Sequence, residues 1–276
     1  MQHKSNEEDI DDDDKYWEDK LPSDYQRYIE MSDEPFSYTT KKELYLLFCH
    51  GFLARNGELW FSTYERTCGI CSMQPSTHVL FNDSCYNRLE TLSLPESRFK
   101  QVKKLGTFFF YAFTYRLESF MFSPDHYTYA CYLVFKFEDD HVLSNDRPIF
   151  TSKYELGGND FRIRVFANLD LTSVITIPTL KPKEDIGSSK GNDGLGMSKV
   201  YTEIRKNKSW VEKRDDGWLE ARLTKPLLKK HHLENLEELK VKLWEWQPGS
   251  GALRGIIVES VEFRPVVVDN GWIIYG

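Results

Sequence analysis

The stretch at residues 127–139, YTYACYLVFKFED, constrains the fold more than any other part of this chain. Every second residue from Tyr127 to Phe137 is apolar, and these residues share one face because side chains alternate between the faces of a strand. The opposite face is apolar at its centre and polar at both ends. This pattern predicts a central β-strand that is covered on one side and partly covered on the other.

Short segments rich in aromatic and β-branched residues precede and follow this strand, with turn residues between them. The chain shows no βαβ spacing and no internal repeat, so we predict an all-β fold, an antiparallel β-sandwich. Residues 181–199 concentrate Gly, Ser, Lys and Asp, which predicts a mobile surface loop. The predicted strands are 52–55, 58–63, 99–104, 107–119, 149–154, 161–166, 218–223, 239–246 and 255–263, the last closed by Arg264-Pro265, with an edge strand within 266–275.

The N-terminal part differs from the rest of the chain in charge. Residues 1–34 hold 13 acidic and 4 basic side chains, whereas the whole chain has a net charge of −7, so the remainder is close to neutral. Such an acidic segment predicts disorder. We divide the chain into a disordered acidic arm at 1–38, a short helix and β-hairpin at 39–77, and the sandwich at 78–276.

The segment after the arm carries clear local signals. Thr40 begins a capping box with Glu43, which predicts a short N-terminal helix that ends near Cys49, with Gly51 as its stop. Asn56-Gly57 lies between the first two predicted strands and predicts a β-hairpin with a type I′ turn.

Composition also limits the cellular setting and the partners. The chain has no apolar run long enough to span a membrane, and its N-terminus lacks the apolar core of a secretory signal. Its five cysteines are an odd number, which favours reduced thiols in the cytosol. The near-neutral charge of the folded part does not favour nucleic acid or a membrane as a partner.

No motif in the chain indicates catalysis or a cofactor. It has no Gly-x-Ser-x-Gly sequence, no Gly-rich phosphate loop and no protein-kinase signature, so we predict that it is not an enzyme. Cys68 and Cys71, with His78 and Cys85 further along, contain the ligand types of a zinc site. Their spacing matches no established pattern, so buried cysteines within a strand are the favoured interpretation, and no metal is predicted.

Two tryptophan positions allow both a structural and a functional interpretation. Trp218 follows the turn before a strand, where a buried, structural tryptophan is favoured over a functional one. Trp244 alternates with Lys240 and Lys242 and precedes Glu245, so it is predicted to be exposed beside a carboxylate. An aromatic ring and a hydrogen-bond acceptor suit a sugar, but an aromatic plug at the end of the sandwich fits the same residues.

Three ordered stretches, 127–137, 214–223 (RDDGWLEARL) and 253–265 (LRGIIVESVEFRP), together resemble the plant phloem-lectin family, also called Nictaba-like lectins. The resemblance covers roughly residues 78–267. Residues 51–73 are similar to an N-terminal extension seen in some members, certain of which are fused to protein kinases. The resemblance implies a β-sandwich of jelly-roll type, a cytoplasmic and nuclear location, and binding of N-acetylglucosamine oligomers or N-glycan cores.

The resemblance also implies a carbohydrate site. The family site uses two glutamates, whose positions fall on Glu238 and Glu245, and two tryptophans, whose positions fall near residues 80–81 and 87–88. No tryptophan stands at either place, and Phe81 or Tyr86 would take over part of the stacking role. With Trp244, these residues form the predicted carbohydrate site.

Two functions of different classes follow. The first is a carbohydrate-binding module with weak affinity, whose partners are glycans or glycoproteins. The second is a protein-interaction module that keeps the sandwich and has lost the sugar site. A protein partner and a homodimer are compatible with both hypotheses, whereas neither involves nucleic acid or a membrane.

Overall fold

A computed structural model describes residues 14–64, 68–81, 89–107, 110–122, 128–138, 148–156, 159–166, 208–224, 227–228, 238–245, 249–269 and 272–274. Tyr86, Cys85 and the predicted loop at 181–199 lie outside these ranges. In the ranges given, no helix has both the length and the apolar character that a membrane span requires.

The described strands, in chain order, are β1 (Phe52–Ala54), β2 (Leu59–Tyr64), β3 (Gly69–Pro75), β4 (Leu80–Phe81), β5 (Leu89–Leu92), β6 (Val102–Leu105), β7 (Phe110–Arg116), β8 (Thr128–Phe137), β9 (Pro148–Leu156), β10 (Asn159–Phe166), β11 (Lys208–Lys213), β12 (Leu219–Arg222), β13 (Leu227–Leu228), β14 (Glu238–Glu245), β15 (Ile256–Asp269) and β16 (Trp272–Ile274). The α-helices α2 (Tyr25–Met31) and α3 (Lys41–His50) precede them, and residues 14–18 are helical as well. A short 3₁₀-helix, η1 (Ser119–Met121), follows β7.

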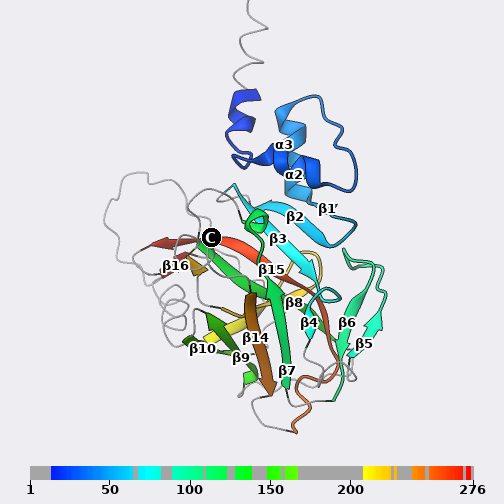
Figure 1. Cartoon of the computed structure of the whole chain (residues 1–276), viewed down its shortest axis with the longest axis vertical. Helices are drawn as coiled ribbons and strands as arrows, with labels where there is room; N and C mark the ends of the chain where they lie inside the picture. Colours follow the sequence, from blue (N-terminus) through cyan, green and yellow to red (C-terminus); the bar gives the residue numbers. More distant parts are fainter. Residues whose placement is uncertain are drawn as a thin grey trace, which may run out of the picture.

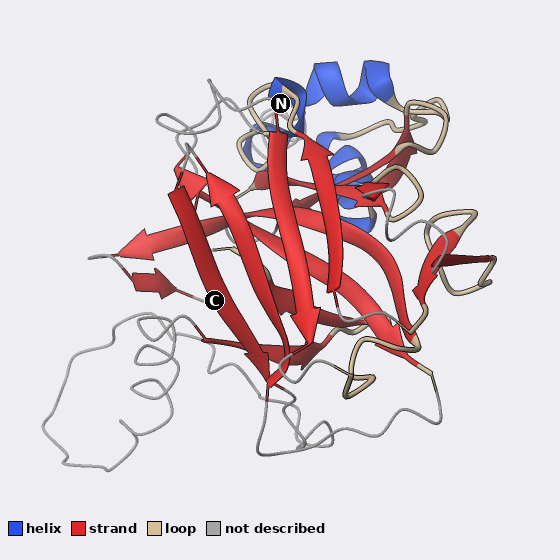
Figure 2. Cartoon of the chain, turned by 60° about the horizontal axis from the view of Figure 1, so that its bottom comes forward, coloured by secondary structure: helices blue, strands red, loops and turns tan. Residues whose placement is uncertain are grey.

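The strands form two layers, which Figures 1 and 2 show from two directions. We call β1-β2-β3-β15-β8-β12-β11 the long sheet and β10-β9-β14-β7-β4 the short sheet. Their pairing is antiparallel except between β10 and β11, which run parallel and connect the two sheets. The all-β, antiparallel prediction is therefore confirmed, with one parallel pair that the sequence pattern did not indicate.

The hydrophobic core lies between the two sheets. Phe135 of the long sheet contacts Phe150 of the short sheet with ring centroids 6.4 Å apart, and Tyr115 contacts Phe263 in the same way at 6.2 Å. Edge-to-face pairs of this kind add to the stabilisation that comes from buried apolar area. The arrangement is that of a sandwich whose inner faces interdigitate.

The central position predicted for residues 127–139 is confirmed. Strand β8 pairs with β15 on one side and with β12 on the other. Its residues from Tyr129 to Phe135 are all buried, because alternate side chains enter the main core while Ala130, Tyr132 and Val134 are covered on the opposite face. Coverage of this second face is therefore more complete than its polar ends indicated.

The N-terminal helix and hairpin are also confirmed. The Thr40 hydroxyl accepts a hydrogen bond from the amide of Glu43, and α3 ends where Gly51 adopts a φ of 78°. A side chain at Gly51 would collide with the ring of Trp60, at 2.4 Å from Nε1, so the close approach requires glycine. Asn56 and Gly57 have φ values of 60° and 77°, as a type I′ turn needs.

The prediction of a disordered arm at 1–38 is wrong for residues 14–38. Helix α2 lies within this segment, and its Tyr28 is fully buried. The carboxylate of Asp33 accepts hydrogen bonds from the amides of Asn56 and Gly57, at 2.6 and 2.7 Å, and so attaches the segment to the hairpin turn. Helical spacing separates four apolar residues of this segment: Trp17, Leu21, Tyr25 and Tyr28. The prediction of disorder used the number of acidic residues and did not take this spacing into account.

Strand β15 is longer than predicted. It does not end at Arg264-Pro265 but continues to Asp269, and Pro265 pairs with Tyr129 of β8. Pairing with β3 on the other side of β15 ends at Phe263. Proline, which lacks an amide hydrogen, is tolerated where a strand has a neighbour on one side only.

Candidate functional site

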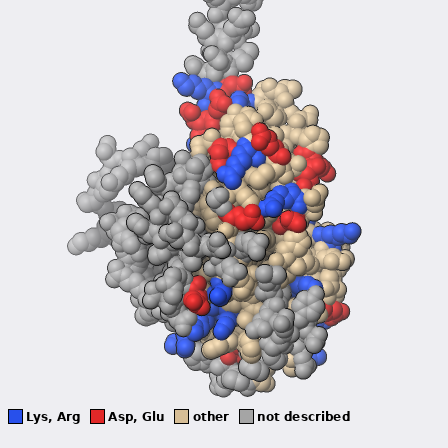
Figure 3. All heavy atoms as spheres, viewed as in Figure 1, with Lys and Arg blue, Asp and Glu red and all other residues tan. Residues whose placement is uncertain are grey.

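Strand β14 carries most of the residues predicted to bind a sugar, and it lies between β7 and β9 in the short sheet. Leu239, Val241 and Leu243 are buried in the core, whereas the alternate residues face outward. Trp244 is 36% exposed, as its alternation with Lys240 predicted. Figure 3 shows basic side chains gathered over β9, β10 and β14 on this outer surface.

Glu245 has a different role from its neighbour Trp244. It is 7% exposed, and its carboxylate accepts hydrogen bonds from the amides of Gly249 at 2.8 Å and Leu253 at 3.5 Å. These bonds anchor the turn that precedes β15, in which Gly249 and Gly251 have positive φ values. The structure therefore places Glu245 inside the protein and does not bring it onto the surface that Trp244 occupies.

The remaining predicted residues lie at other places in the short sheet. Phe81 of β4 is paired with Phe113, which is itself paired with Val241, so Phe81 belongs to a row three residues from Trp244 along β14. Glu238 is the first residue of β14 and pairs with Arg116. Tyr86 lies outside the described residues. Participation of these three residues in a carbohydrate site stays a prediction.

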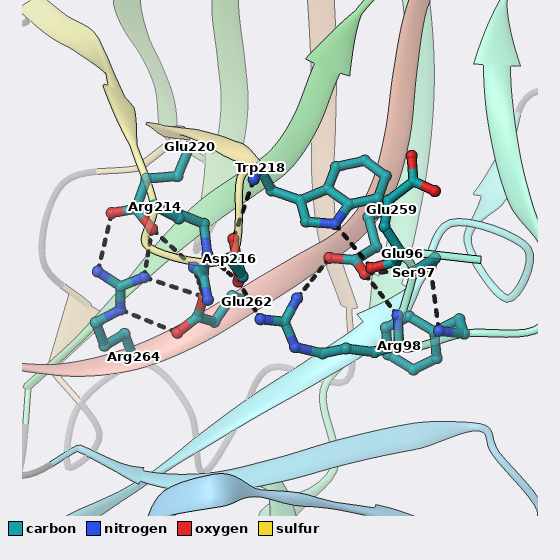
Figure 4. A network of polar contacts seen from close by, with 11 residues as sticks. Glu96, Ser97, Arg98, Arg214, Asp216, Trp218, Glu220, Glu259, Glu262 and Arg264 are labelled. Atoms are coloured by element: carbon teal, nitrogen blue, oxygen red, sulfur yellow. Dashed lines mark hydrogen bonds and ion pairs between the residues drawn. The ribbon is translucent and has the colours of Figure 1, made fainter. Parts of the chain in front are cut away.

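A network of paired charges lies on the outer face of the long sheet (Figure 4). Arg264 binds Glu220 through two hydrogen bonds of 2.9 and 2.6 Å, and binds Glu262 through two more of 2.9 and 3.0 Å. Arg214 Nη1 donates to the same two carboxylates, at 2.8 and 2.6 Å. Two arginines and two glutamates thus alternate, and the paired contacts of Arg264 have the fork geometry that makes arginine–carboxylate bonds strong.

The network continues through Asp216 to Arg98 and Glu259. Arg214 Nε and Arg98 both donate to Asp216, and Arg98 Nη1 also donates to Glu259 at 2.8 Å. Asp216 accepts the amide of Trp218 at 3.1 Å, which fixes the turn before β12. Trp218 is 1% exposed, so the structural interpretation of this tryptophan is confirmed.

The pKa values of two glutamates of β15, Glu259 and Glu262, shift in opposite directions. Burial alone raises the pKa of Glu262, but Arg264 and Arg214 outweigh it and hold that pKa well below its usual range. For Glu259, burial dominates and raises the pKa although Arg98 and its backbone amide oppose the shift. Glu262 is therefore charged in the folded protein and needs its arginines, since an unpaired buried carboxylate is strongly unfavourable.

The charges of this network are paired with one another. Its arginines already donate to its carboxylates, and the Arg264 guanidinium lies 4.5 Å from the ring centroid of Tyr132. Sequence reasoning assigned no role to these charges. The signal was present in GIIVESVEFRP, where Glu259 and Glu262 interrupt an otherwise apolar strand and therefore require buried partners.

The cysteines provide no metal centre within the described ranges. Cys71 is buried in β3, and burial raises the pKa of its thiol, while Cys68 precedes this strand with a φ of 53°. In the part of the chain that the structure covers, no three His, Cys, Asp or Glu side chains are grouped as metal ligands. None of the four described cysteines forms a disulfide.

The arrangement of β8, the Asp216–Trp218 turn and β15 coincides with the three stretches that carried the resemblance. The sequence model of the family "Phloem protein 2" matches residues 68–265, which is most of the chain. The chain belongs to the phloem protein 2 family. This family is lectin-like and binds carbohydrate.

Similar proteins come from Arabidopsis thaliana. "F-box protein PP2-B5" is 25% identical over 254 residues, which cover 91% of this chain and 74% of the relative. "Putative F-box protein PP2-B12" is 26% identical over 252 residues, which cover 90% of this chain and 82% of the relative. The likeness of residues 51–73 to an extension found in kinase-fused members stays a prediction.

Proposed function

We propose that this protein is a carbohydrate-binding module and that the sugar contacts the outer face of the short sheet at Trp244. The observation that carries the proposal is the exposure of this ring on a flat sheet surface, in a chain that belongs to a lectin-like family. Large aromatic side chains are usually covered, and an exposed tryptophan offers an apolar face for the apolar face of a sugar ring.

The neighbours of Trp244 support such a contact. Phe110 of β7 and Thr151 of β9 pair with it from the two sides, and both are half-buried. The Phe110 ring widens the apolar platform, and the Thr151 hydroxyl is both a donor and an acceptor for sugar hydroxyls. In this proposal Glu245 contributes indirectly, because it fixes the turn that follows β14.

The expected ligands are N-acetylglucosamine oligomers or N-glycan cores in the cytoplasm or nucleus. The family resemblance supports this choice, and Glu238 and Tyr86 are the further residues proposed to contact the ligand; Phe81 is left out because it pairs in the row of the buried Phe113 and Val241. A single tryptophan provides less stacking area than two, so binding by one domain should be weak and should depend on ligands that display several sugars.

Calorimetry with oligomers of N-acetylglucosamine tests the proposal, after a glycan array has identified the best ligand. Trp244→Ala should weaken binding about tenfold, the loss expected when an aromatic contact worth about 1.4 kcal/mol is removed. Trp210→Ala is the matched control, since Trp210 of β11 is also 36% exposed. Equal binding by wild type and Trp244→Ala would place the sugar elsewhere, and absence of binding to every neutral or acidic glycan would contradict the proposed function.

A protein-interaction module is the second candidate, and one observation favours it. Helix α3 exposes two consecutive leucines, Leu46 and Leu47, at 44% and 37%. The relatives named above carry "F-box protein" in their names, which supports a protein partner for this chain as well. If the glycan array is negative, loss of a defined protein partner on Leu46→Asp with Leu47→Asp would support this alternative.

A further inference from the structure

Three basic side chains lie directly opposite one another across the short sheet. Arg162 of β10 pairs with Lys153 of β9, which pairs in turn with Lys242 of β14. Paired residues project from the same face of a sheet, and neighbouring strands are about 4.8 Å apart. Val241 and Leu243 on the other face are buried, so this cationic row is on the outer surface.

Basic residues outnumber acidic residues on the outer face of the short sheet when the cationic row is included. Arg164 and Lys240 are both exposed and lie two residues along their strands from Arg162 and Lys242. Three acidic residues share the face in the strand register: Glu155 pairs with both Lys240 and Asp160, and Glu238 begins β14 two residues before Lys240. Among the residues that the structure covers, Arg162, Lys240 and Lys242 make no ion pair.

Like charges directly opposite each other destabilise a sheet, so Arg162, Lys153 and Lys242 repel one another in this row. The same chain pairs its buried arginines fully on the long sheet, where Arg214 and Arg264 alternate with glutamates. Arg162, Lys240 and Lys242 are exposed and make no ion pair within the described residues, so these three cations are suited to negative charges supplied by a ligand.

Trp244 specifies the ligand further. It follows Lys242 by two residues and therefore projects from the same face, about 6.8 Å along the strand. A ligand that uses both features must combine a flat apolar surface with negative groups a few ångströms away. A sugar ring that bears a carboxylate meets this requirement, because its C–H face stacks on the indole while the carboxylate accepts charge-assisted hydrogen bonds.

We propose that the outer face of the short sheet binds an acidic oligosaccharide whose rings carry carboxylates, as in oligomers of uronic acids. The proposal rests on the proposed carbohydrate binding and adds a second, acidic ligand class to the N-acetylglucosamine ligands expected from the family. One ring packs on Trp244, and carboxylates of the neighbouring units pair with Lys242 and Arg162. Arginine suits this role because its planar guanidinium binds a carboxylate through two hydrogen bonds.

Single-stranded nucleic acid is the competing anionic ligand, and the aromatic content of the face disfavours it. Sheets that bind single-stranded RNA commonly stack two or three bases on aromatic side chains. Among the described side chains of β7, β9 and β14, Trp244 is the one exposed aromatic. A single ring beside a cationic row fits one sugar ring and its charged neighbours better than a series of stacked bases.

The test uses the full chain and compares an acidic oligomer with its uncharged ester and with two ligands of other classes. The probes are an oligomer of galacturonic acid, the same oligomer with methyl-esterified carboxylates, an oligomer of N-acetylglucosamine and a single-stranded oligonucleotide. Lys242→Gln with Arg162→Gln removes two cations from the row. Lys100→Gln with Lys213→Gln is the control, because it removes two exposed cations from outside the short sheet. Thermal unfolding of each variant establishes that the fold is intact.

We expect the galacturonate oligomer to bind roughly tenfold more tightly than its methyl ester, and the Lys242/Arg162 variant to lose this difference while the control keeps it. Added salt should reduce the difference, because screening acts over about 8 Å at physiological ionic strength. Equal binding of ester and acid would overturn the proposal and leave carbohydrate binding intact. Binding of the oligonucleotide alone, lost in the Lys242/Arg162 variant, would overturn the ligand class, and binding of no sugar would contradict the proposed function too.

Discussion

The outer faces of the two sheets differ in how their charged side chains are paired. On the long sheet, Glu262 and Arg264 belong to a network in which each arginine donates to more than one carboxylate, and the glutamates are almost fully buried. On the short sheet, Lys242 and Arg162 stand in the cationic row, exposed and close to Trp244. Arginines stand on both faces, and the difference is that Arg162 and Lys242 make no ion pair within the described residues.

This difference separates residues that hold the fold from residues available to a ligand. Two of the stretches that identify the family, 214–223 and 253–265, contribute most residues of the long-sheet network. Their presence in a sequence therefore indicates the fold and does not indicate which residues bind a ligand. Exposed cations contribute little to stability, because water screens them and their side chains lose entropy when they are fixed. Mutations on the long sheet should therefore affect stability, and mutations on the short sheet should affect binding.

The largest effect is expected at the centre of the long-sheet network. Glu262→Gln keeps the side-chain volume but leaves Arg264 and Arg214 with an uncompensated, largely buried positive charge. Breaking one partner of a buried ion pair costs about 3–5 kcal/mol of unfolding free energy. Urea denaturation measures this loss, and Glu155→Gln on the exposed short-sheet face is the control, with an expected change below about 0.5 kcal/mol. Similar losses in both variants would contradict the contrast between the sheets.

Glu245→Gln should have the next largest effect. The substitution removes the charge from a carboxylate that accepts two backbone hydrogen bonds, and bonds to charged groups contribute about 1.5–3 kcal/mol. Hydrogen exchange at the amides of Gly249 and Leu253 should accelerate. If the variant instead loses sugar affinity while these amides stay protected, Glu245 acts on the ligand directly, as the family resemblance implied.

Much of the architecture is predictable from local pattern, and the failures have physical causes. The strand around Leu133 and the capped helix from Thr40 were predicted correctly, because periodicity and capping depend on a few residues that are close together in the sequence. The arm was misjudged because charge was counted over the segment, whereas the burial of Tyr28 depends on the hairpin against which it packs. Strand β15 was cut short at Pro265, because sequence does not show that this position has a neighbour on one side only.

The site was less predictable than the fold. The exposure of Trp244 follows from strand alternation, but the burial of Glu245 does not, because it depends on a turn that folds back over the end of β14. The long-sheet network joins Arg98 to Glu259, which are far apart in sequence, so no local pattern pairs them. The cationic row likewise exists only in the register of β10, β9 and β14.

The two glutamates of β15 should give opposite contributions to the pH dependence of stability. The depressed pKa of Glu262 provides stability that is present above the unfolded pKa of about 4.3 and is lost as the pH falls through the folded value. The raised pKa of Glu259 provides stability below about pH 4.3 that is lost as the pH rises through its folded value. Both signs follow from which state, folded or unfolded, binds the proton more tightly.

Urea denaturation at a series of pH values separates the two contributions. Glu262→Gln should flatten the rise of stability with pH below about 4.3, whereas Glu259→Gln should steepen the rise just above that value. The common reference is the pH profile of the wild type. Identical slopes in both variants would mean that the arginines do not distinguish the two carboxylates.

The smallest effect is expected on the short sheet, and its sign is the informative part. Lys242→Gln removes one of three like charges that lie side by side, and relief of such repulsion contributes about 0.2–1 kcal/mol. The variant should therefore unfold at the same or slightly higher urea concentration, and the gain should disappear at high salt because screening already weakens the repulsion. Lys100→Gln, outside the row, should show no gain. A clear loss of stability in Lys242→Gln would mean that this lysine is held by a partner within the fold, and the cationic row would then resemble the long-sheet network instead of a surface open to ligand.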